Sequence, residues 1–388
     1  MSFRDITEKV ESYLLAVIED RRQGKGATVL RWLLLLLSGL FSLIVQARLW
    51  LYRRGIFRHH TLGCQVISIG NLTVGGTGKT PIVEVFARTL QKSGRKVAIL
   101  SRGYKSERPP LADRMIGKFK YGEDFQQPRV VSDGKRLLLD SLTGGDEPFM
   151  LASNLPDVSV IVDKNRVKGG RYAVKHLGCD TLILDDGFQY LSLKHRLDIV
   201  LVDRTNPFGN RRVLPRGILR EPVRNIRRAG FIFITKSYGD GATDLRKQLR
   251  ELNPTAEISE CRHVARYLQD VYTGERKPLE FLKGADVAAI SGIAMPKGFE
   301  DELVRLGASV KVHKCYADHH RYSQQEIIDL INKGLYAGAK IIVTTEKDAV
   351  RFPMVERRDL PIYFLRVEIE MLSGADEFQE WINRICFK

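Results

Sequence analysis

The chain has 388 residues, of which 44% are apolar, so it is long enough for two packed domains and an additional segment. Lysine and arginine outnumber aspartate and glutamate by 62 to 46, and the formal charge of +16 favours an anionic partner: a nucleic acid, an acidic lipid or a phosphorylated substrate. The five cysteines are scattered and form no Cys-x-x-Cys pair, which argues against a disulfide framework or a zinc site and indicates a reducing compartment.

An uncharged apolar run of 16 residues lies between Arg31 and Arg48. As a helix this run would span about 24 Å, which is short against roughly 30 Å of bilayer hydrocarbon. Basic residues flank both of its ends, and Trp32 and Trp50 are placed to lie at headgroup level. We therefore predict that residues 1–60 form a helical, membrane-associated segment whose apolar helix lies in one leaflet. The alternative is a buried core helix.

A glycine-rich turn follows an apolar strand predicted at 66–69 and precedes a helix predicted at 81–90. Such a turn aims backbone N–H groups and the positive end of a helix at one point, which suits a phosphate. The predicted nucleotide-binding residues are Thr73, Val74, Gly75, Gly76, Thr77, Gly78, Lys79 and Thr80. Lys79 would reach the β- and γ-phosphates, and Thr80 would offer its hydroxyl to Mg²⁺. The alternative is a flexible turn with a surface lysine, and Thr73 stands where the usual P-loop has its first glycine.

Strands alternate with helices over most of the chain, which predicts a P-loop NTPase-like α/β fold with a doubly wound parallel sheet. We expect a P-loop kinase domain at 61–237, a linker that includes a hairpin at 238–285, and a second, smaller α/β domain at 286–388. Further strands are expected at 96–100, 159–162, 182–186, 198–203, 230–236, 287–291, 309–316, 341–345 and 362–367. Further helices are expected from 149 and at 166–178, 297–306, 324–334 and 375–385, and a long loop at 105–128. Because ligands bind at the carboxyl ends of parallel strands, we predict the active site in a cleft between the two domains.

Two adjacent carboxylates, Asp185 and Asp186, end the strand predicted at 182–186 in the manner of a Walker B motif. A carboxylate at this end of the sheet can hold Mg²⁺ together with the Thr80 hydroxyl. The alternative is a strand that stops at acidic turn residues. Glu221, in Leu219-Arg220-Glu221-Pro222, is a further candidate ligand.

Asp146 lies where a loop enters a helix, and two interpretations stay open for it. It is either an N-cap that accepts hydrogen bonds from the first helical turn, or a general base that takes a proton from an attacking hydroxyl. Asp318-His319-His320 follows a strand in the second domain, and adjacent histidines there point to opposite faces, which disfavours a joint metal site. A carboxylate-oriented histidine that assists a base fits this motif better. Thr345-Glu346-Lys347-Asp348 either lines the same cleft or forms a salt-bridged surface turn.

Seven motifs, taken in order over nearly the whole chain, resemble the tetraacyldisaccharide 4'-kinases, the lipid A 4'-kinases of Gram-negative envelope biosynthesis. The motifs are Gly70-Asn71-Leu72-Thr73-Val74-Gly75-Gly76-Thr77-Gly78-Lys79-Thr80-Pro81, Ser101-Arg102-Gly103-Tyr104, Gly145-Asp146-Glu147-Pro148, Asp185-Asp186-Gly187-Phe188-Gln189, Leu219-Arg220-Glu221-Pro222, Asp318-His319-His320 and Thr345-Glu346-Lys347-Asp348. Thr73 is part of that family's P-loop. Tyr190 stands where these kinases usually have a histidine, which puts that residue's contribution to substrate binding in doubt.

The resemblance implies ATP-dependent phosphorylation of the 4'-hydroxyl of a tetraacylated glucosamine disaccharide 1-phosphate, at the cytosolic face of the inner membrane. It further implies a role for each residue that matches a motif. Lys79 and Thr80 would bind the triphosphate and Mg²⁺, with Asp185, Asp186 and Glu221 around the metal. Asp146 would be the catalytic base, assisted by His319, and the substrate would contact Arg102, Tyr104 and Gln189.

Two other classes of protein are alternatives to the kinase interpretation. A membrane-bound P-loop switch or partitioning ATPase would need no second α/β domain, and no Asn-Lys-x-Asp motif follows a strand. In a nucleic-acid-binding NTPase we would expect stacking aromatics among the arginines, and the apolar run would have no role. We therefore expect no nucleic-acid partner, and nothing in the sequence demands more than a monomer.

Overall fold

The computed structural model describes residues 13–14, 16–18, 20–75, 78–103 and 127–386. The predicted site residues Gly76, Thr77 and Tyr104 lie outside the described residues, as do most of the predicted loop at 105–128 and the first twelve residues. The chain divides into two compact units, each assembled from separate stretches. The first comprises Met1–Lys79, Asp180–Arg262 and Met371–Lys388, and the second comprises Thr80–Cys179 and His263–Glu370. The contiguous domains predicted from the sequence are therefore wrong, because parallel strands gather segments that lie far apart along the chain.

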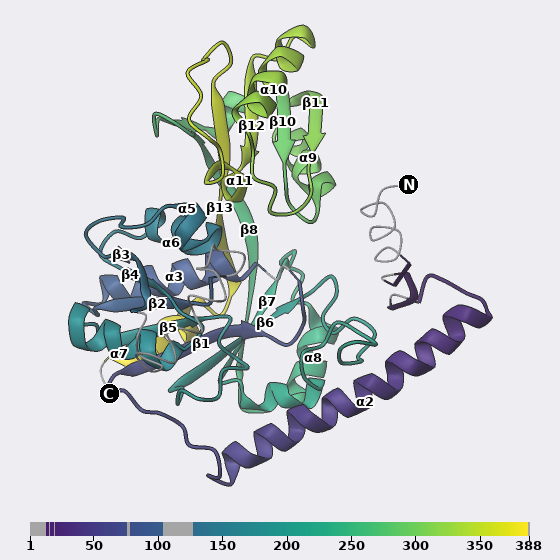
Figure 1. Cartoon of the computed structure of the whole chain (residues 1–388), viewed down its shortest axis with the longest axis vertical. Helices are drawn as coiled ribbons and strands as arrows, with labels where there is room; N and C mark the ends of the chain where they lie inside the picture. The colour runs from purple at the N-terminus through teal and green to yellow at the C-terminus, as the bar shows by residue number, and fades with distance from the viewer. Residues whose placement is uncertain (1–12, 15, 19, 76–77, 104–126, 387–388) are drawn as a thin grey trace, which may run out of the picture. The chain divides into compact units, whose positions relative to one another are not determined.

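The first unit is built on a parallel sheet with the strand order β8-β7-β6-β1-β5 (Figure 1). Its strands are β1 (Gln65–Asn71), β5 (Thr181–Asp185), β6 (Leu197–Asp203), β7 (Phe231–Thr235) and the first part of β8 (Glu257–Asp270). Its helices are α2 (Lys25–Arg53), the short 3-10 helix η1 (Val223–Arg228), α8 (Thr243–Leu252) and α12 (Ala375–Cys386). The apolar side chains of β6 and β7 pack with Leu72, Phe188 and Ile226 into one core. This arrangement confirms the predicted parallel α/β fold.

Helix α2 is longer than the apolar run that predicted it, and its 29 residues correspond to about 44 Å (Figure 1). It is the one helix among the described residues that is long and apolar enough to cross a membrane, and only 11% of its most apolar stretch is buried. Ser38 donates a hydrogen bond to the Val213 carbonyl at 2.8 Å, and Phe41 packs against the core. Because so little of its apolar stretch is buried, the alternative of a buried core helix is wrong. The length argument against a spanning helix does not hold for 29 residues.

In the second unit, the stretch Thr80–Cys179 forms a small sheet of the order β2-β4-β3. Its strands are β2 (Val97–Ser101), β4 (Ser159–Val162) and the antiparallel edge strand β3 (Arg129–Asp133), which the sequence analysis missed. Its helices are α3 (Lys79–Lys92), α5 (Ser141–Gly144), α6 (Asp146–Asn154) and α7 (Arg166–Leu177). Asn165 caps the start of α7 through its side chain, and Gly178 ends it in the left-handed conformation.

The stretch His263–Glu370 contributes strands in the order β11-β10-β12-β13-β8, of which β11, β10, β12 and β13 pair in parallel. The strands are β10 (Asp286–Ser291), β11 (Ser309–Cys315), β12 (Ile341–Thr345) and β13 (Ile362–Ser373), and β9 (Arg276–Pro278) pairs with the end of β8 as the expected hairpin. The helices are η2 (Leu279–Leu282), α9 (Pro296–Arg305), α10 (Gln324–Tyr336) and α11 (Glu346–Ala349). A capping box between Ser323 and Glu326 starts α10.

Two further expectations are wrong. The stretch 238–285 is no linker, since it contains α8 and the 14-residue strand β8, which continues from the first unit into the second. Helix α12 was assigned to the smaller domain, but it belongs to the first unit. There the Phe378 ring lies against Phe231 and Phe233 of β7, at centroid distances of 6.4 and 6.1 Å. Aromatic burial against β7 thus determines where the last helix packs.

Candidate functional site

The P-loop lysine is held at the end of β1. Lys79 Nζ lies 3.4 Å from Asn71 Oδ1 and 3.7 Å from Asp186 Oδ1. The Asn71 side chain is fully buried and also donates to the Thr73 carbonyl at 2.8 Å, so one amide fixes both the start of the loop and its lysine. Thr80 follows in the first turn of α3. An ammonium group at this position, at the carboxyl end of a parallel sheet, is placed to bind phosphate.

The strand that carries Asp185 lies directly beside β1, with Ile69 opposite Asp185. Close packing explains the glycine of the P-loop strand, because a Cβ atom on Gly70 would lie 2.8 Å from the Phe188 Cβ atom. Asp185 is buried, whereas Asp186 is in the left-handed conformation and accepts from Arg220 Nη1 at 2.8 and 2.7 Å. Arg220 and Lys79 therefore both offset the charge of Asp186.

Glu221 is buried, and donors from three residues occupy both of its oxygens. Arg228 pairs with it at 2.7 and 3.0 Å, and the amides of Gln189 and Asn225 each donate at 2.8 Å. Gln189 also donates to the Asn71 carbonyl at 3.0 Å. In this geometry Glu221 and Gln189 join the Asp-Asp-Gly-Phe-Gln turn to the end of β1. Contact of Gln189 with substrate stays a prediction.

The implied magnesium site can be tested against these contacts. Among the described residues, no group of three or more His, Cys, Asp or Glu side chains is placed to hold a metal ion. Glu221 does not fit as a ligand, because Arg228 already neutralises it and both of its oxygens accept hydrogen bonds. Mg²⁺ that arrives with ATP needs only one or two protein oxygens besides the phosphates. The Asp185 carboxylate and the Thr80 hydroxyl have the right chemistry for that smaller set.

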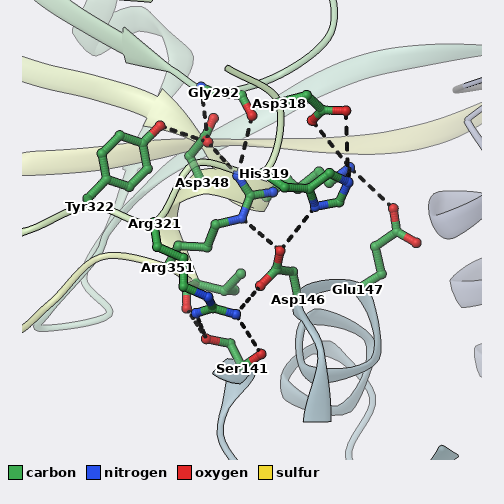
Figure 2. A network of polar contacts seen from close by, with 12 residues as sticks. Ser141, Asp146, Glu147, Gly292, Asp318, His319, Arg321, Tyr322, Asp348 and Arg351 are labelled. Carbon is green, nitrogen blue, oxygen red and sulfur yellow. Dashed lines mark hydrogen bonds and ion pairs between the residues drawn. The ribbon is translucent and has the colours of Figure 1, made fainter. Parts of the chain in front are cut away.

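Asp146 is the first residue of α6, and it does not cap the helix. The N-cap position belongs to Gly145, whose φ of 94° favours glycine, and the Asp146 side chain accepts no capping hydrogen bond. Its carboxylate instead turns toward the stretch after β11, as Figure 2 shows. Oδ1 accepts from Arg321 Nη2 at 2.9 Å, and Oδ2 lies 2.8 Å from Arg351 Nε and 3.2 Å from His319 Nδ1. The capping interpretation is wrong.

His319 lies in a left-handed backbone conformation with a φ of 65°, which a histidine seldom adopts. While Nδ1 faces Asp146, Nε2 lies 3.5 Å from Lys347 Nζ and 3.8 Å from Asp318 Oδ2 (Figure 2). Lys347 in turn pairs with Glu147 at 3.3 Å. The structure therefore brings together Asp146 and His319, two residues 173 positions apart, together with the lysine of the Thr-Glu-Lys-Asp motif. Strained backbone of this kind is concentrated at functional sites.

Burial acts to raise the pKa of Asp146, but the His319 hydrogen bond and the charges of Arg351 and Arg321 outweigh it and lower that pKa. Asp146 is consequently ionised at neutral pH and able to accept a proton. While both arginines and His319 contact Asp146, its carboxylate is a weak base. A substrate contact that displaces one of these cations would make Asp146 a stronger base and so favour proton transfer.

Sequence analysis missed the two arginines that contact Asp146. Arg321 lies two residues after His319, and Arg351 lies three after Asp348, but no spacing rule marks either as a partner of a carboxylate on another helix. Arg102 is exposed at the end of β2, and its predicted contact with substrate stays a prediction. The predicted residues thus form two groups: the set around Lys79 in the first unit, and the set around Asp146 in the second.

Comparisons with known proteins identify the family of this chain. The family model described as tetraacyldisaccharide-1-P 4'-kinase matches residues 30–116 and 120–386. A tetraacyldisaccharide 4'-kinase of Anaeromyxobacter dehalogenans is 42% identical over 350 residues, covering 88% of this chain and 87% of the relative. One of Halothermothrix orenii is 32% identical over 397 residues, covering 98% and 99%.

A solved structure is also similar over most of the chain. The "apo" form of LpxK from Aquifex aeolicus in complex with ATP superposes with a TM-score of 0.71 at 30% identity, covering 92% of this chain and all of that one. A family model that matches nearly the whole chain, relatives of equal length and a solved structure of the same fold all agree. The chain therefore belongs to the tetraacyldisaccharide-1-P 4'-kinase family.

Proposed function

We propose that this protein transfers the γ-phosphoryl group of ATP to the 4'-hydroxyl of a tetraacylated glucosamine disaccharide 1-phosphate, a precursor of lipid A. The observation that carries this proposal is the buried, ionised Asp146 carboxylate in contact with His319, in a chain whose P-loop lysine is held at the end of β1. Phosphoryl transfer requires little more from the protein than positioning of the reactants and neutralisation of charge.

In the reaction, the 4'-oxygen attacks the γ-phosphorus, the bond to the β–γ bridging oxygen breaks, and ADP leaves. Asp146 accepts the hydroxyl proton, and His319 orients the carboxylate through Nδ1. Lys79 places its ammonium group against the β- and γ-phosphates. Mg²⁺, held by Thr80 and Asp185, would neutralise charge on the phosphates.

The substrate class calls for a membrane-bound enzyme, since an acylated disaccharide phosphate stays in the bilayer. The exposed apolar side chains of α2 and the formal charge of +16 supply hydrophobic and electrostatic attraction to the cytosolic face of the inner membrane. Stable anchoring generally takes two such signals. Sedimentation with anionic liposomes tests this part: full-length protein is expected in the pellet, and a variant lacking residues 1–60 in the supernatant.

The direct test is transfer of label from γ-labelled ATP to the tetraacyl disaccharide 1-phosphate in detergent micelles. Labelled lipid is expected with the wild type and is expected to disappear with Lys79→Ala, because the phosphates lose their ammonium partner. Lys92→Ala, at the exposed end of the same helix, is the matched control and should leave transfer unchanged. Release of inorganic phosphate without labelled lipid would contradict the kinase assignment and favour a switch ATPase.

A further inference from the structure

A guanidinium group that is closed to solvent lies directly behind the predicted base. The Arg351 side chain is 0% exposed, and its Nε donates to Asp146 Oδ2 at 2.8 Å. Its Nη1 lies 3.1 Å from Asp348 Oδ1 and 3.3 Å from the Gly292 carbonyl oxygen (Figure 2). One buried arginine therefore joins the carboxylate at the start of α6 to the carboxylate of the Thr-Glu-Lys-Asp motif.

Both carboxylate oxygens of Asp348 accept hydrogen bonds, and one of them also pairs with Arg351. It is also 0% exposed, and its Oδ1 accepts from the Tyr322 hydroxyl at 2.9 Å and from the Gly292 N–H at 3.1 Å. Its Oδ2 accepts from the Thr345 hydroxyl at 2.6 Å. Burial and the charge of Asp348 raise the pKa of Tyr322, so the phenol stays protonated and donates a hydrogen bond to Asp348. With both oxygens occupied, Asp348 acts as a fixed counter-charge for Arg351 and is no competing base.

The second arginine on Asp146 is held much less firmly. The Arg321 side chain is 39% exposed, and within the part of the chain that the structure describes its hydrogen bonds besides that to Asp146 go to Ser141, at 3.0 Å to the carbonyl and 3.4 Å to the hydroxyl. Water screens an exposed ion pair, whereas a pair out of contact with water keeps most of its interaction. Arg321 can thus leave when a substrate approaches, while Arg351 stays.

Packing alone gives no reason for a guanidinium in this place. Arg351 Nη2 is buried without a hydrogen-bond partner among the described residues. Burying a charged pair is costly, and a buried donor left unpaired adds to that cost. Such departures from ordinary packing are expected where a group serves a site.

We propose that Arg351 is a positioning residue for phosphoryl transfer: balanced by Asp348, it fixes the orientation of the Asp146 carboxylate and keeps it ionised. This inference rests on the proposed role of Asp146 as base. The groups that contact Asp146 are His319, Arg321 and Arg351. Among the described residues, the charged groups around them are Asp318, Lys347, Glu147, Asp348 and Asp140.

The test measures kcat, the KM for ATP and the pH dependence of kcat/KM for the lipid acceptor in four variants, with thermal melting as the control for folding. Arg351→Lys keeps the buried charge but loses the planar fork that contacts two groups at once. Arg351→Met combined with Asp348→Asn removes both buried charges, so no unpaired ion is left inside the protein. Arg321→Met removes the exposed cation from the same carboxylate, and Asp146→Asn removes the base itself.

We expect Arg351→Lys to lower kcat about 100-fold, which is the loss typical of a catalytic group displaced by about 1 Å. The KM for ATP should stay within twofold of the wild-type value. The acidic limb of the pH profile of kcat/KM should not move. The double variant should move the acidic limb to higher pH, because burial then raises the pKa of Asp146 without the buried cation that opposes it. Arg321→Met should move this limb less. A purely structural role of Arg351 would change melting temperature and leave the limb in place.

Two results would overturn the inference: wild-type kcat in Arg351→Lys, or an acidic limb in the folded double variant that coincides with that of the wild type. Asp146→Asn separates this failure from failure of the proposed function. Loss of transfer in Asp146→Asn together with an unmoved limb in the double variant refutes only the role of Arg351. Transfer that persists in Asp146→Asn refutes the base assignment itself.

Discussion

Replacing Arg366 with methionine is expected to lower the stability of α3 and α6 together. The Arg366 side chain is 5% exposed on β13, where Nη1 donates to both oxygens of Glu346 at 2.7 and 2.9 Å and Nη2 donates to Glu84 of α3. Asn154, at the end of α6, donates to Glu346 at 2.6 Å. This buried cluster joins the helix after the P-loop, the helix that begins at Asp146 and the start of α11.

The expected magnitude follows from what the substitution leaves behind. Removing one partner of a buried ion pair typically costs about 3–5 kcal/mol, because a buried charge stays uncompensated. Here two carboxylates lose the cation, although Glu84 keeps Arg88 at 2.7 Å. Arg88 is 41% exposed, so Arg88→Met is the matched control, with an expected loss of at most about 1 kcal/mol.

The loss should depend on pH in a defined direction. Burial raises the pKa of Glu346 above its usual value, and without Arg366 that pKa rises further. A carboxyl group with a raised folded-state pKa binds its proton more tightly in the folded protein, so its stability contribution is present at low pH and lost as pH rises. The deficit of Arg366→Met is therefore expected to be small near pH 4 and largest at neutral pH.

Hydrogen exchange is the appropriate assay, because the three tryptophans, Trp32, Trp50 and Trp381, all belong to the first unit. A loss of 3–5 kcal/mol corresponds to exchange roughly a hundred- to several-thousand-fold faster for the amides of α3 and α6 that open with the cluster. An effect of Arg366→Met no larger than that of Arg88→Met, or one independent of pH, would refute this reasoning.

Two further substitutions test the first unit. Gly70→Ala should lower both the melting temperature and the affinity for ATP. The new Cβ atom would lie 2.8 Å from the Phe188 Cβ atom, at the strand that leads into the P-loop. Wild-type ATP affinity in a titration would show that the strand can shift at no cost. Glu221→Gln should lower the melting temperature, since Arg228, whose side chain is only 14% exposed, then faces a neutral amide. The dependence of kcat on Mg²⁺ concentration should stay unchanged. A marked increase in the Mg²⁺ required would restore Glu221 as a metal ligand.

Much of the fold was predictable because buried parallel strands have nearly continuous apolar sequences. For this reason β4 was predicted at its observed bounds, and β5 was predicted within one residue at each end. α8 and β8 were missed because their sequences are rich in charged residues, and only alternate stretches of β8 are buried. No local pattern indicates that β8 and β13 each contribute to both units, since that follows from contacts between distant segments.

The candidate site shows the same limit. A loop-to-helix junction made Asp146 a candidate, but only the structure distinguishes a cap from a carboxylate that binds two arginines and a histidine. Glu221 does not fit the predicted metal set for a related reason. Sequence analysis identified the acidic residues, but it did not show that Arg228 would neutralise Glu221.

The central claim is that Asp146, oriented by His319, takes the proton from the acceptor hydroxyl. Single-turnover transfer of labelled phosphoryl from ATP to the tetraacyl disaccharide 1-phosphate, in wild type and Asp146→Asn, tests it most directly. We expect a rate constant about 10²- to 10⁴-fold lower in Asp146→Asn, with ATP affinity unchanged, because a general base contributes to the chemical step. A rate constant within threefold of the wild type would contradict it.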